Sequence, residues 1–285
     1  MKSSYRDELV GVFGYPIDEN PSVIIEEAAF NAMQLKYRYL TIEVKPEDLE
    51  NAIIGMKAMN MKGINITIPH KCAVLKYLDV IAEDAMIMGA VNAIHVIEGK
   101  LYGENTDGKG FLMSLKNGGV DVKDKRVSIL GAGGVARAIS VELARNGVKN
   151  IEIVNIYEAE GKELVRILNE KTEASARFML WTKPYEVNSN IDIFVNATPI
   201  GLYPDIDKKP NVNYDSIQKN MIVCDVIPNH PHTQFLQEAE KRGARTFDGL
   251  EMLVNQGALN FTRWTGIEAP IKIMVDALKN EFDIK

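Results

Sequence analysis

The stretch "VSILGAGGVARA", residues 127–138, decides the fold, because an apolar strand, a glycine-rich turn and the start of a helix follow one another in it. Gly131, Gly133 and Ala136 have the G-x-G-x-x-A spacing of a dinucleotide-binding turn. The first glycine permits a tight turn, the second lets the backbone approach a pyrophosphate, and the small alanine lets the helix pack on the strand. A turn that serves packing alone and an S-adenosylmethionine site are the competing interpretations.

The chain around this turn alternates strands with helices. Near-continuous apolar strands separated by helices are typical of a parallel sheet covered on both faces. The sequence therefore predicts an α/β protein with a Rossmann-type domain over residues 107–248. Its strands are expected at 125–130, 148–156, 191–199, 221–227 and 244–249, and its later helices at 161–172 and 232–243.

The residues before the turn predict a second α/β domain over 1–106. The segment "GINITIPHK", residues 63–71, alternates isoleucine with Asn65 and Thr67 like a half-buried strand, and then delivers Lys71. A hairpin is expected around Glu98 and Gly99. Two amphipathic helices follow the last strand, and we expect them to return to the first domain, so that 249–285 completes it.

Composition narrows the class of protein. The chain has 285 residues, 46% of them hydrophobic and 25% charged, with a net charge of −6. These values are typical of a soluble two-domain protein, and the absence of a basic surplus argues against nucleic acid as a partner. The start "MKSSYRDELV" has no signal-peptide core, and no apolar run approaches a membrane span. Cys72 and Cys224 have no metal-site spacing, so we expect a cytoplasmic protein with no bound metal.

The end of the strand after the glycine turn selects the cofactor. An acidic residue there suits the ribose 2′-hydroxyl of NAD, and an arginine suits the 2′-phosphate of NADP. Here Asn155 can bond the ribose, Glu158 and Glu160 would repel a phosphate, and Lys162 is the only nearby cation. The sequence favours NAD over NADP. The residues predicted to contact the dinucleotide are Gly131, Ala132, Gly133, Gly134, Val135, Ala136, Arg137, Asn155, Asn196, Ala197, Thr198 and Gly249.

Seven short motifs occur in one order along nearly the whole chain. They are "GYPI", "NITIPHK", "GAVNAI", "GENTDG", "GAGGVA", "NATPIG" and "DGLEMLVNQGA". This order and spacing resemble the shikimate dehydrogenase family, which includes the quinate/shikimate dehydrogenases. The resemblance implies NAD(P)-dependent interconversion of shikimate and 3-dehydroshikimate in aromatic amino acid biosynthesis, with quinate or a related cyclohexane carboxylate as the close alternative.

The resemblance also implies site residues. Lys71 is the expected catalytic residue, with Asp107 beside the reacting hydroxyl. Oxidation of a secondary alcohol removes a proton from oxygen, and a lysine can exchange that proton or stabilise an alkoxide as a cation; the sequence leaves both roles open. The residues implied to bind substrate are Asn20, Ser22, Asn65, Thr67, Lys71, Asn92, Thr106, Asp107 and Gln256.

Three positions depart from the family pattern. The usual His-Ser-x-Ser-Pro, whose two hydroxyls bind the substrate carboxylate, is replaced by Glu19-Asn20-Pro21-Ser22-Val23. Ile156 stands where NADP-dependent members carry arginine, and Pro228 stands where a tyrosine is frequent. Ser22 has an ordinary alternative as a helix N-cap. These changes keep a second hypothesis open, a non-catalytic dinucleotide-binding sensor. The sequence leaves the oligomeric state open between monomer and homodimer.

Overall fold

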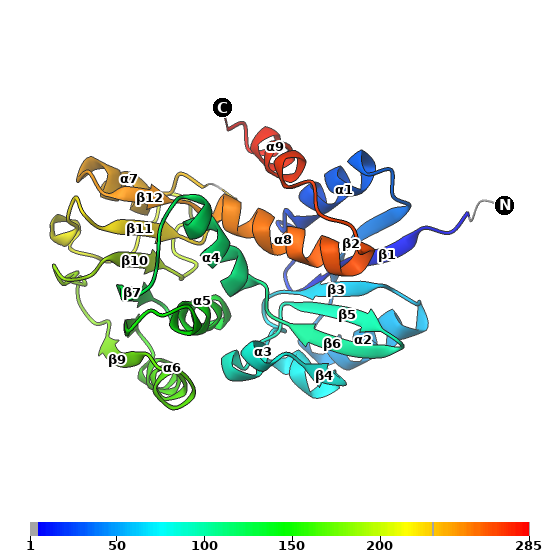
Figure 1. Cartoon of the computed structure of the whole chain (residues 1–285), viewed down its shortest axis with the longest axis horizontal. Helices are drawn as coiled ribbons and strands as arrows, with labels where there is room; N and C mark the ends of the chain where they lie inside the picture. The colour runs from blue at the N-terminus through cyan, green and yellow to red at the C-terminus, as the bar shows by residue number, and fades with distance from the viewer. Residues whose placement is uncertain (1–4, 230, 285) are drawn as a thin grey trace. The chain divides into compact units, whose positions relative to one another are not determined.

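The computed structural model describes residues 5–229 and 231–284, which form two compact units (Figure 1). One unit extends to Thr106 and resumes at Val254, and the other is Asp107–Leu253. Helix α9 (Ile271–Glu281) packs against α1 (Ser22–Ala32), so the C-terminal helices join the N-terminal unit. The first four residues of "MKSSYRDELV" lie outside the described part of the chain.

The N-terminal unit contains a mixed six-stranded sheet in the order β2-β1-β3-β5-β6-β4. The first three of these strands are mutually parallel, and β5 and β6 form the predicted antiparallel hairpin. The strands are β1 (Glu8–Gly14), β2 (Tyr37–Glu43), β3 (Gly63–Ile66), β4 (Val80–Ile81), β5 (Ala93–Ile97) and β6 (Lys100–Glu104).

Helices accompany this sheet, and its core includes the buried side chains of Phe13, Ile64 and Ile94. Besides α1 and α9, the helical segments of this unit are η1 (Pro46–Asp48), α2 (Leu49–Ala58), η2 (Ala73–Tyr77), α3 (Glu83–Met88) and the part of α8 (Gly249–Thr265) that begins at Val254.

Strand β3 differs from the half-buried strand that its alternation predicts. All four of its residues are buried, including Asn65, so β3, which lies between β1 and β5, is covered on both faces of the sheet. Ile68, which the alternation places on the apolar face, lies beyond the strand and is 65% exposed. Asn65 is therefore buried and must find hydrogen-bond partners inside the protein.

The second unit contains six parallel strands in the order β12-β11-β10-β7-β8-β9, as predicted for a Rossmann-type sheet. The strand order reverses at β7 and β10, the switch point where such sheets bind nucleotides. The strands are β7 (Arg126–Leu130), β8 (Asn150–Asn155), β9 (Ser175–Leu180), β10 (Ile193–Asn196), β11 (Ile222–Asp225) and β12 (Arg245–Phe247). The helical segments are α4 (Asp107–Asn117), α5 (Gly134–Arg145), α6 (Glu158–Lys171), η3 (Tyr214–Ser216) and α7 (Gln234–Lys241).

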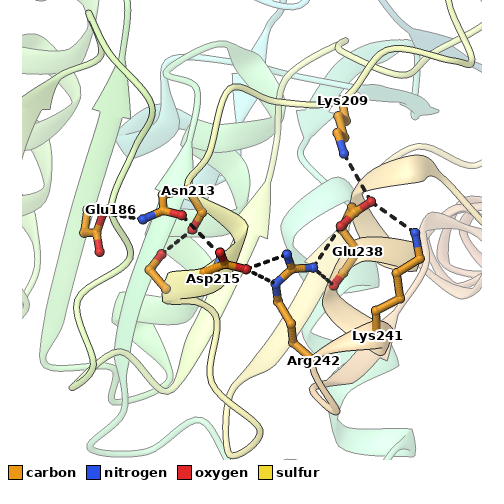
Figure 2. A network of polar contacts seen from close by, with 8 residues as sticks. Glu186, Lys209, Asn213, Asp215, Glu238, Lys241 and Arg242 are labelled. Atoms are coloured by element: carbon orange, nitrogen blue, oxygen red, sulfur yellow. Dashed lines mark hydrogen bonds and ion pairs between the residues drawn. The ribbon is translucent and has the colours of Figure 1, made fainter.

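A polar network holds the outer helix α7 to the segment around η3 (Figure 2). The Arg242 guanidinium donates to Asp215 and to Glu238, each at 2.8 Å. Glu238 also accepts from Lys209 and Lys241, and these three cations hold the pKa of its carboxyl down at about 2. The residues of this network are not among those predicted to bind the cofactor or the substrate.

Candidate active site

The glycine turn lies at the switch point of the parallel sheet. Gly131 follows β7 with a φ of +105°, and a Cβ there would stand 2.9 Å from the carbonyl oxygen of Ala197, which follows β10. Gly133 precedes α5 in an extended conformation, and a Cβ there would meet no protein atom within 4 Å. The protein therefore requires the first glycine for its own packing, whereas the second leaves space in front of the helix N-terminus.

That space suits a dinucleotide pyrophosphate. The first turn of α5 carries no acidic residue, and its N–H groups and dipole favour an anion. Ala136 is fully buried, as expected for the residue that packs helix on strand, and Arg137 is half-buried in the same turn. The predicted residues Gly131, Ala132 and Gly133 thus form the turn between β7 and α5, and Gly134 and Val135 are the first two residues of α5.

After β8, the cation considered for binding a 2′-phosphate is Lys162, and its ammonium is paired with a carboxylate. Asn155 uses its side-chain N–H on the carbonyl of Tyr157 at 3.0 Å, so its Oδ1 is the atom suited to accept from a ribose hydroxyl. The Lys162 ammonium is 2.6 Å from the Glu158 carboxylate one helical turn away. Ile156 is exposed and uncharged.

Both polar groups of the Asn196 side chain, at the end of β10, form hydrogen bonds within the protein. Its side chain is fully buried, donates to Asp225 at 3.1 Å and accepts from the Thr198 hydroxyl at 2.6 Å. Thr233 also donates to Asp225, and burial raises the pKa of that carboxyl to about 7. Asn196 therefore shapes the loop, and the half-buried Ala197 and Thr198 are the residues of this predicted group that a ligand can reach.

Gly249 opens helix α8 and has a packing reason to be glycine. A Cβ at this position would stand 2.6 Å from the backbone of Val226 and Ile227. The close approach brings the start of α8 against the segment after β11. Contact of Gly249 with a cofactor stays a prediction.

The N-terminal unit assembles a chain of buried polar groups. The phenol of Tyr39 on β2 donates to Asn65 Oδ1 on β3 at 2.8 Å, and Asn65 Nδ2 donates to the carbonyl of Asn92 at 3.3 Å. Asn92 Oδ1 accepts from the Thr106 backbone N–H at 2.7 Å, and its Nδ2 lies 3.0 Å from the Thr106 hydroxyl. Gln256 Oε1 is 3.5 Å from that same hydroxyl. Four predicted substrate residues therefore form one network.

The segment before α1 brings Asn20 and Ser22 together. Asn20 Oδ1 accepts from the Ser22 N–H at 3.0 Å, so the asparagine satisfies a backbone donor at the helix start. Ser22 is the first residue of α1, while the N-cap position belongs to Pro21, which makes no side-chain cap. The interpretation of Ser22 as the N-cap was therefore wrong, because its hydroxyl bonds the phenol of Tyr39 instead.

The segment that carries Lys71 is held in place by a backbone hydrogen bond of Lys71 and by the buried ring of His70. The carbonyl of Lys71 accepts from Val91 N–H at 2.8 Å, directly before Asn92. His70 is buried, and its ring lies 2.7 Å from the Val44 carbonyl, which gives it a structural role and leaves Lys71, half-buried, as the candidate for chemistry. Thr67 is also half-buried and bonds the Phe13 carbonyl through its N–H.

Asp107 is the first residue of α4. In the sequence it directly follows Thr106, which belongs to the polar network. The Asp107 side chain is 8% exposed. It is the first residue of the second unit. A catalytic role for Asp107 stays a prediction.

Three polar residues of this region were absent from the sequence-based prediction. Tyr39 links Ser22 to Asn65, Asn260 donates to Gln256 Oε1 at 3.1 Å, and Glu26 is fully buried on the same helix as Ser22. The sequence carries a signal for Glu26, because it lies on the apolar stripe of α1 where a charged residue is unusual. Tyr39 and Asn260 carry none, because only the tertiary structure brings β2 and α8 to β3.

Within residues 5–229 and 231–284, no group of three or more His, Cys, Asp or Glu side chains is placed to hold a metal ion. In the same part of the chain, no helix combines the length and apolar character that crossing a membrane requires.

The chain is similar to known proteins over nearly its whole length. The model of the shikimate dehydrogenase substrate-binding domain matches residues 12–94, and that of the shikimate 5′-dehydrogenase C-terminal domain matches 249–279. The shikimate dehydrogenase (NADP(+)) of Methanocaldococcus jannaschii is 42% identical over 278 residues, covering 96% of each chain.

Two solved structures share the whole fold. The ligand-free 5-ketofructose reductase of Gluconobacter sp. strain CHM43 is 44% identical with a TM-score of 0.92, covering 98% of this chain and 100% of that one. Shikimate 5-dehydrogenase of Listeria monocytogenes, in complex with shikimate and NAD, is 33% identical with a TM-score of 0.89, covering 98% of both. With the glycine turn at the switch point and the Asn65–Gln256 network in place, these full-length matches show that the chain belongs to the shikimate dehydrogenase family.

Proposed function

We propose that this protein is an NAD(P)-dependent oxidoreductase that interconverts a secondary alcohol and a ketone on a polyhydroxylated substrate. The reaction favoured by the curated relatives is that of shikimate and 3-dehydroshikimate, with quinate as the close alternative. The observation that carries the proposal is the buried network of Asn65, Asn92, Thr106 and Gln256, since four neutral amide and hydroxyl groups suit the recognition of ring hydroxyls.

Each of the predicted site residues has its own role in the oxidation of the alcohol. The nicotinamide supplies the hydride acceptor when it is bound. Lys71 then takes the hydroxyl proton or stabilises the negative oxygen, and Asp107 orients the lysine and the reacting hydroxyl. The amides of Asn65, Asn92 and Gln256 bind the hydroxyl groups of the substrate ring.

We propose NAD as the preferred cofactor. The loop after β8 supports it, because Ile156 is uncharged and the ammonium of Lys162 is paired with Glu158. The curated relatives carry NADP(+) in their names, and the Listeria structure holds NAD, so the family accommodates both. Comparing kcat/KM for NAD and NADP with one substrate tests this, and a higher value for NADP would show that another cation compensates.

The proposed activity is tested by following nicotinamide absorbance. Purified protein should reduce NAD or NADP when shikimate or quinate is added, between about pH 7 and pH 10. Tight dinucleotide binding without turnover of any tested alcohol would instead identify the protein as a non-catalytic dinucleotide sensor.

An uncharged keto sugar is a second candidate substrate. Two observations favour it: the 44% identity to the 5-ketofructose reductase, and the presence of Glu19 and Asn20 where the family usually has a histidine and a serine. Oxidation of NADH or NADPH by 5-ketofructose, measured beside 3-dehydroshikimate, separates the two candidates.

A further inference from the structure

The carboxyl of Asp225 joins the segments that follow two neighbouring strands of the parallel sheet. Asp225 is the last residue of β11 and is 1% exposed. Its Oδ1 accepts from Asn196 Nδ2 at 3.1 Å and from the Ile227 N–H at 3.3 Å, and its Oδ2 accepts from the Thr233 hydroxyl at 2.7 Å. One buried side chain therefore holds the end of β10, the loop after β11 and the start of α7 together.

The hydrogen bonds beyond Asn196 fix the orientation of its amide. Asn196 Oδ1 accepts from the hydroxyl of Thr198 at 2.6 Å and from its N–H at 3.2 Å. The Thr198 hydroxyl oxygen accepts in turn from the Ile200 N–H at 3.3 Å. Because an amide accepts through oxygen and donates through nitrogen, these contacts leave Asn196 Nδ2 to donate to Asp225. Each of the described hydrogen-bond partners of the Asp225 carboxyl is therefore a donor.

Protonation of Asp225 conflicts with this arrangement. An ionised carboxylate accepts from all of these donors, whereas a protonated carboxyl carries an O–H group that itself needs an acceptor. Turning the Asn196 amide would supply that acceptor, but its Nδ2 would then face the N–H and the hydroxyl of Thr198. The Thr198 N–H would lose its acceptor, and the segment 196–200 would have to change shape. The ionised form of Asp225 therefore fits the observed loop.

The same loop packs against the glycine turn. The Ala197 N–H donates to the Leu130 carbonyl at 2.9 Å, directly before Gly131. A Cβ at Gly131 would stand 2.9 Å from the Ala197 carbonyl oxygen and 3.3 Å from Thr198 Cγ2. Because the two segments are packed this closely, a change in the shape of the loop displaces the turn that is predicted to bind the pyrophosphate.

Asp225 changes its charge near neutral pH. Burial raises the pKa of its carboxyl to about 7, and the hydrogen-bond donors oppose that rise. Cys224 on β11 and Tyr214 on η3 interact electrostatically with Asp225, and burial first, then negative charge nearby, raises the pKa of each, so neither ionises below pH 8. Glu238 on α7 and the following Arg242 interact with Tyr214 and stay charged, since the pKa of Glu238 is about 2 and arginine does not lose its proton.

We propose that Asp225 is a positioning residue for the dinucleotide, and that its ionised form holds the segment 196–200 in the shape that the dinucleotide binds. Asp225 acts through Asn196 and Thr198, without touching the cofactor. By linkage, binding of the dinucleotide then removes the proton from any Asp225 that carries one. The inference rests on the proposed function, because it assigns a role in binding the same dinucleotide.

The test counts the protons released when NADH binds. NADH is titrated calorimetrically into the protein at pH 6.5 in two buffers of different ionisation enthalpy, since the difference between the two heats gives the number of protons. We expect about half a proton per NADH, which corresponds to about tenfold tighter binding to the ionised form. The dissociation constant should rise about fivefold from pH 8 to pH 6. NADPH is avoided because a phosphate monoester itself titrates near pH 6.

Variants locate the proton on Asp225. Asp225→Asn cannot ionise, so NADH binding should release less than about 0.1 proton, and the dissociation constant at pH 8 should be about tenfold higher than that of the unmodified protein. Thr233→Val removes a donor that stabilises the carboxylate and should move the pH of greatest proton release upward by about half a unit or more. Thr233→Ser keeps the hydroxyl and should keep the unmodified value.

Two histidines near the same loop serve as matched controls, because histidine also titrates in this range. His232 is exposed and lies 3.0 Å from the Glu240 carboxylate, and His230 lies outside the described residues. His232→Gln and His230→Gln should each release as many protons as the unmodified protein. Circular dichroism confirms that each variant is folded, and the Thr233 pair decides the question if Asp225→Asn is not.

Three results would overturn the inference: NADH binding by the unmodified protein without proton release, release that persists in Asp225→Asn, or release in Thr233→Val at the unmodified pH. Loss of release in either histidine variant would assign the proton to that histidine and overturn it as well. A parallel assay of hydride transfer separates this from the proposed function. Failure to transfer hydride from bound NADH to any tested ketone refutes the dehydrogenase, while the proton count still tests Asp225.

Discussion

At the scale of single residues, neighbours in sequence have separate roles in the structure. His70 and Lys71 are both basic and adjacent, yet the His70 ring is buried against the Val44 carbonyl while the Lys71 side chain is half-buried. The resemblance to a family selected Lys71, and the burial of His70 supplies a physical reason for the choice. Residue types alone could not separate the two.

Replacing Lys71 by alanine should lower kcat at least about a hundredfold, as expected when a proton-transfer group is lost. Lys71→Arg separates the two roles left open, because arginine keeps the charge but does not release its proton. Recovery to within about tenfold indicates charge stabilisation. Lys76→Ala, an exposed lysine on η2, is the control, and equal kcat for Lys71→Ala and this control would remove Lys71 from the site.

At the scale of elements, strand and turn geometry decides which side chains a ligand can reach. The sequence predicted most of the strands, since their apolar runs are unambiguous, but not β9, whose residues are mostly exposed or half-buried at the edge of the sheet. The glycine turn was predicted from the spacing of its small residues between an apolar strand and a helix. Its two glycines nevertheless serve different purposes, as the atoms around them show.

The glycine turn gives a paired prediction. Gly131→Ala should lower the unfolding free energy by about 1–3 kcal/mol, because φ is +105° and the new Cβ meets the Ala197 carbonyl. Gly133→Ala should keep the stability within about 1 kcal/mol and weaken dinucleotide binding at least about tenfold. Denaturant unfolding and fluorescence titration with NADH measure the two. Equal NADH affinity of Gly133→Ala and the unmodified protein would contradict the pyrophosphate assignment.

The loop between β8 and α6 gives a prediction on cofactor choice. Ile156→Arg places a guanidinium where the exposed isoleucine now stands, and we expect the ratio of kcat/KM for NADP over NAD to rise at least about tenfold. Lys183→Arg, an exposed change elsewhere in the same unit, should leave the ratio unaltered. A ratio unaffected by Ile156→Arg would place the adenosine ribose away from this loop.

At the scale of the whole molecule, each unit buries a carboxyl whose pKa burial raises, Glu26 in one and Asp225 in the other. Asp225 has a pKa of about 7 when folded and about 4 when unfolded, so the contribution of this carboxyl to folding stability is fully present below pH 4 and is lost as the pH rises through 7. Asp225 accounts for a loss of about 4 kcal/mol over this range.

Asp225→Asn should therefore flatten the decline in unfolding free energy between pH 4.5 and pH 8, as measured by urea unfolding at both pH values. The exposed Asp207→Asn is the matched control and should keep the slope of the unmodified protein. An unchanged slope in Asp225→Asn would show that this carboxyl is already ionised in the folded state well below pH 7.

The sequence by itself determined the α/β class, the nucleotide-binding turn, the family and the residues implied for substrate and cofactor, because local spacing and apolar periodicity encode these features. Only the tertiary structure decided how those residues are used. In it, Tyr39 on β2 contacts Asn65 and Ser22, and Asn196 donates a hydrogen bond to Asp225. Glu26 is buried and its carboxyl has no hydrogen-bond partner. The physical reason is that hydrogen-bond direction and burial depend on neighbours from distant segments, which no local pattern specifies.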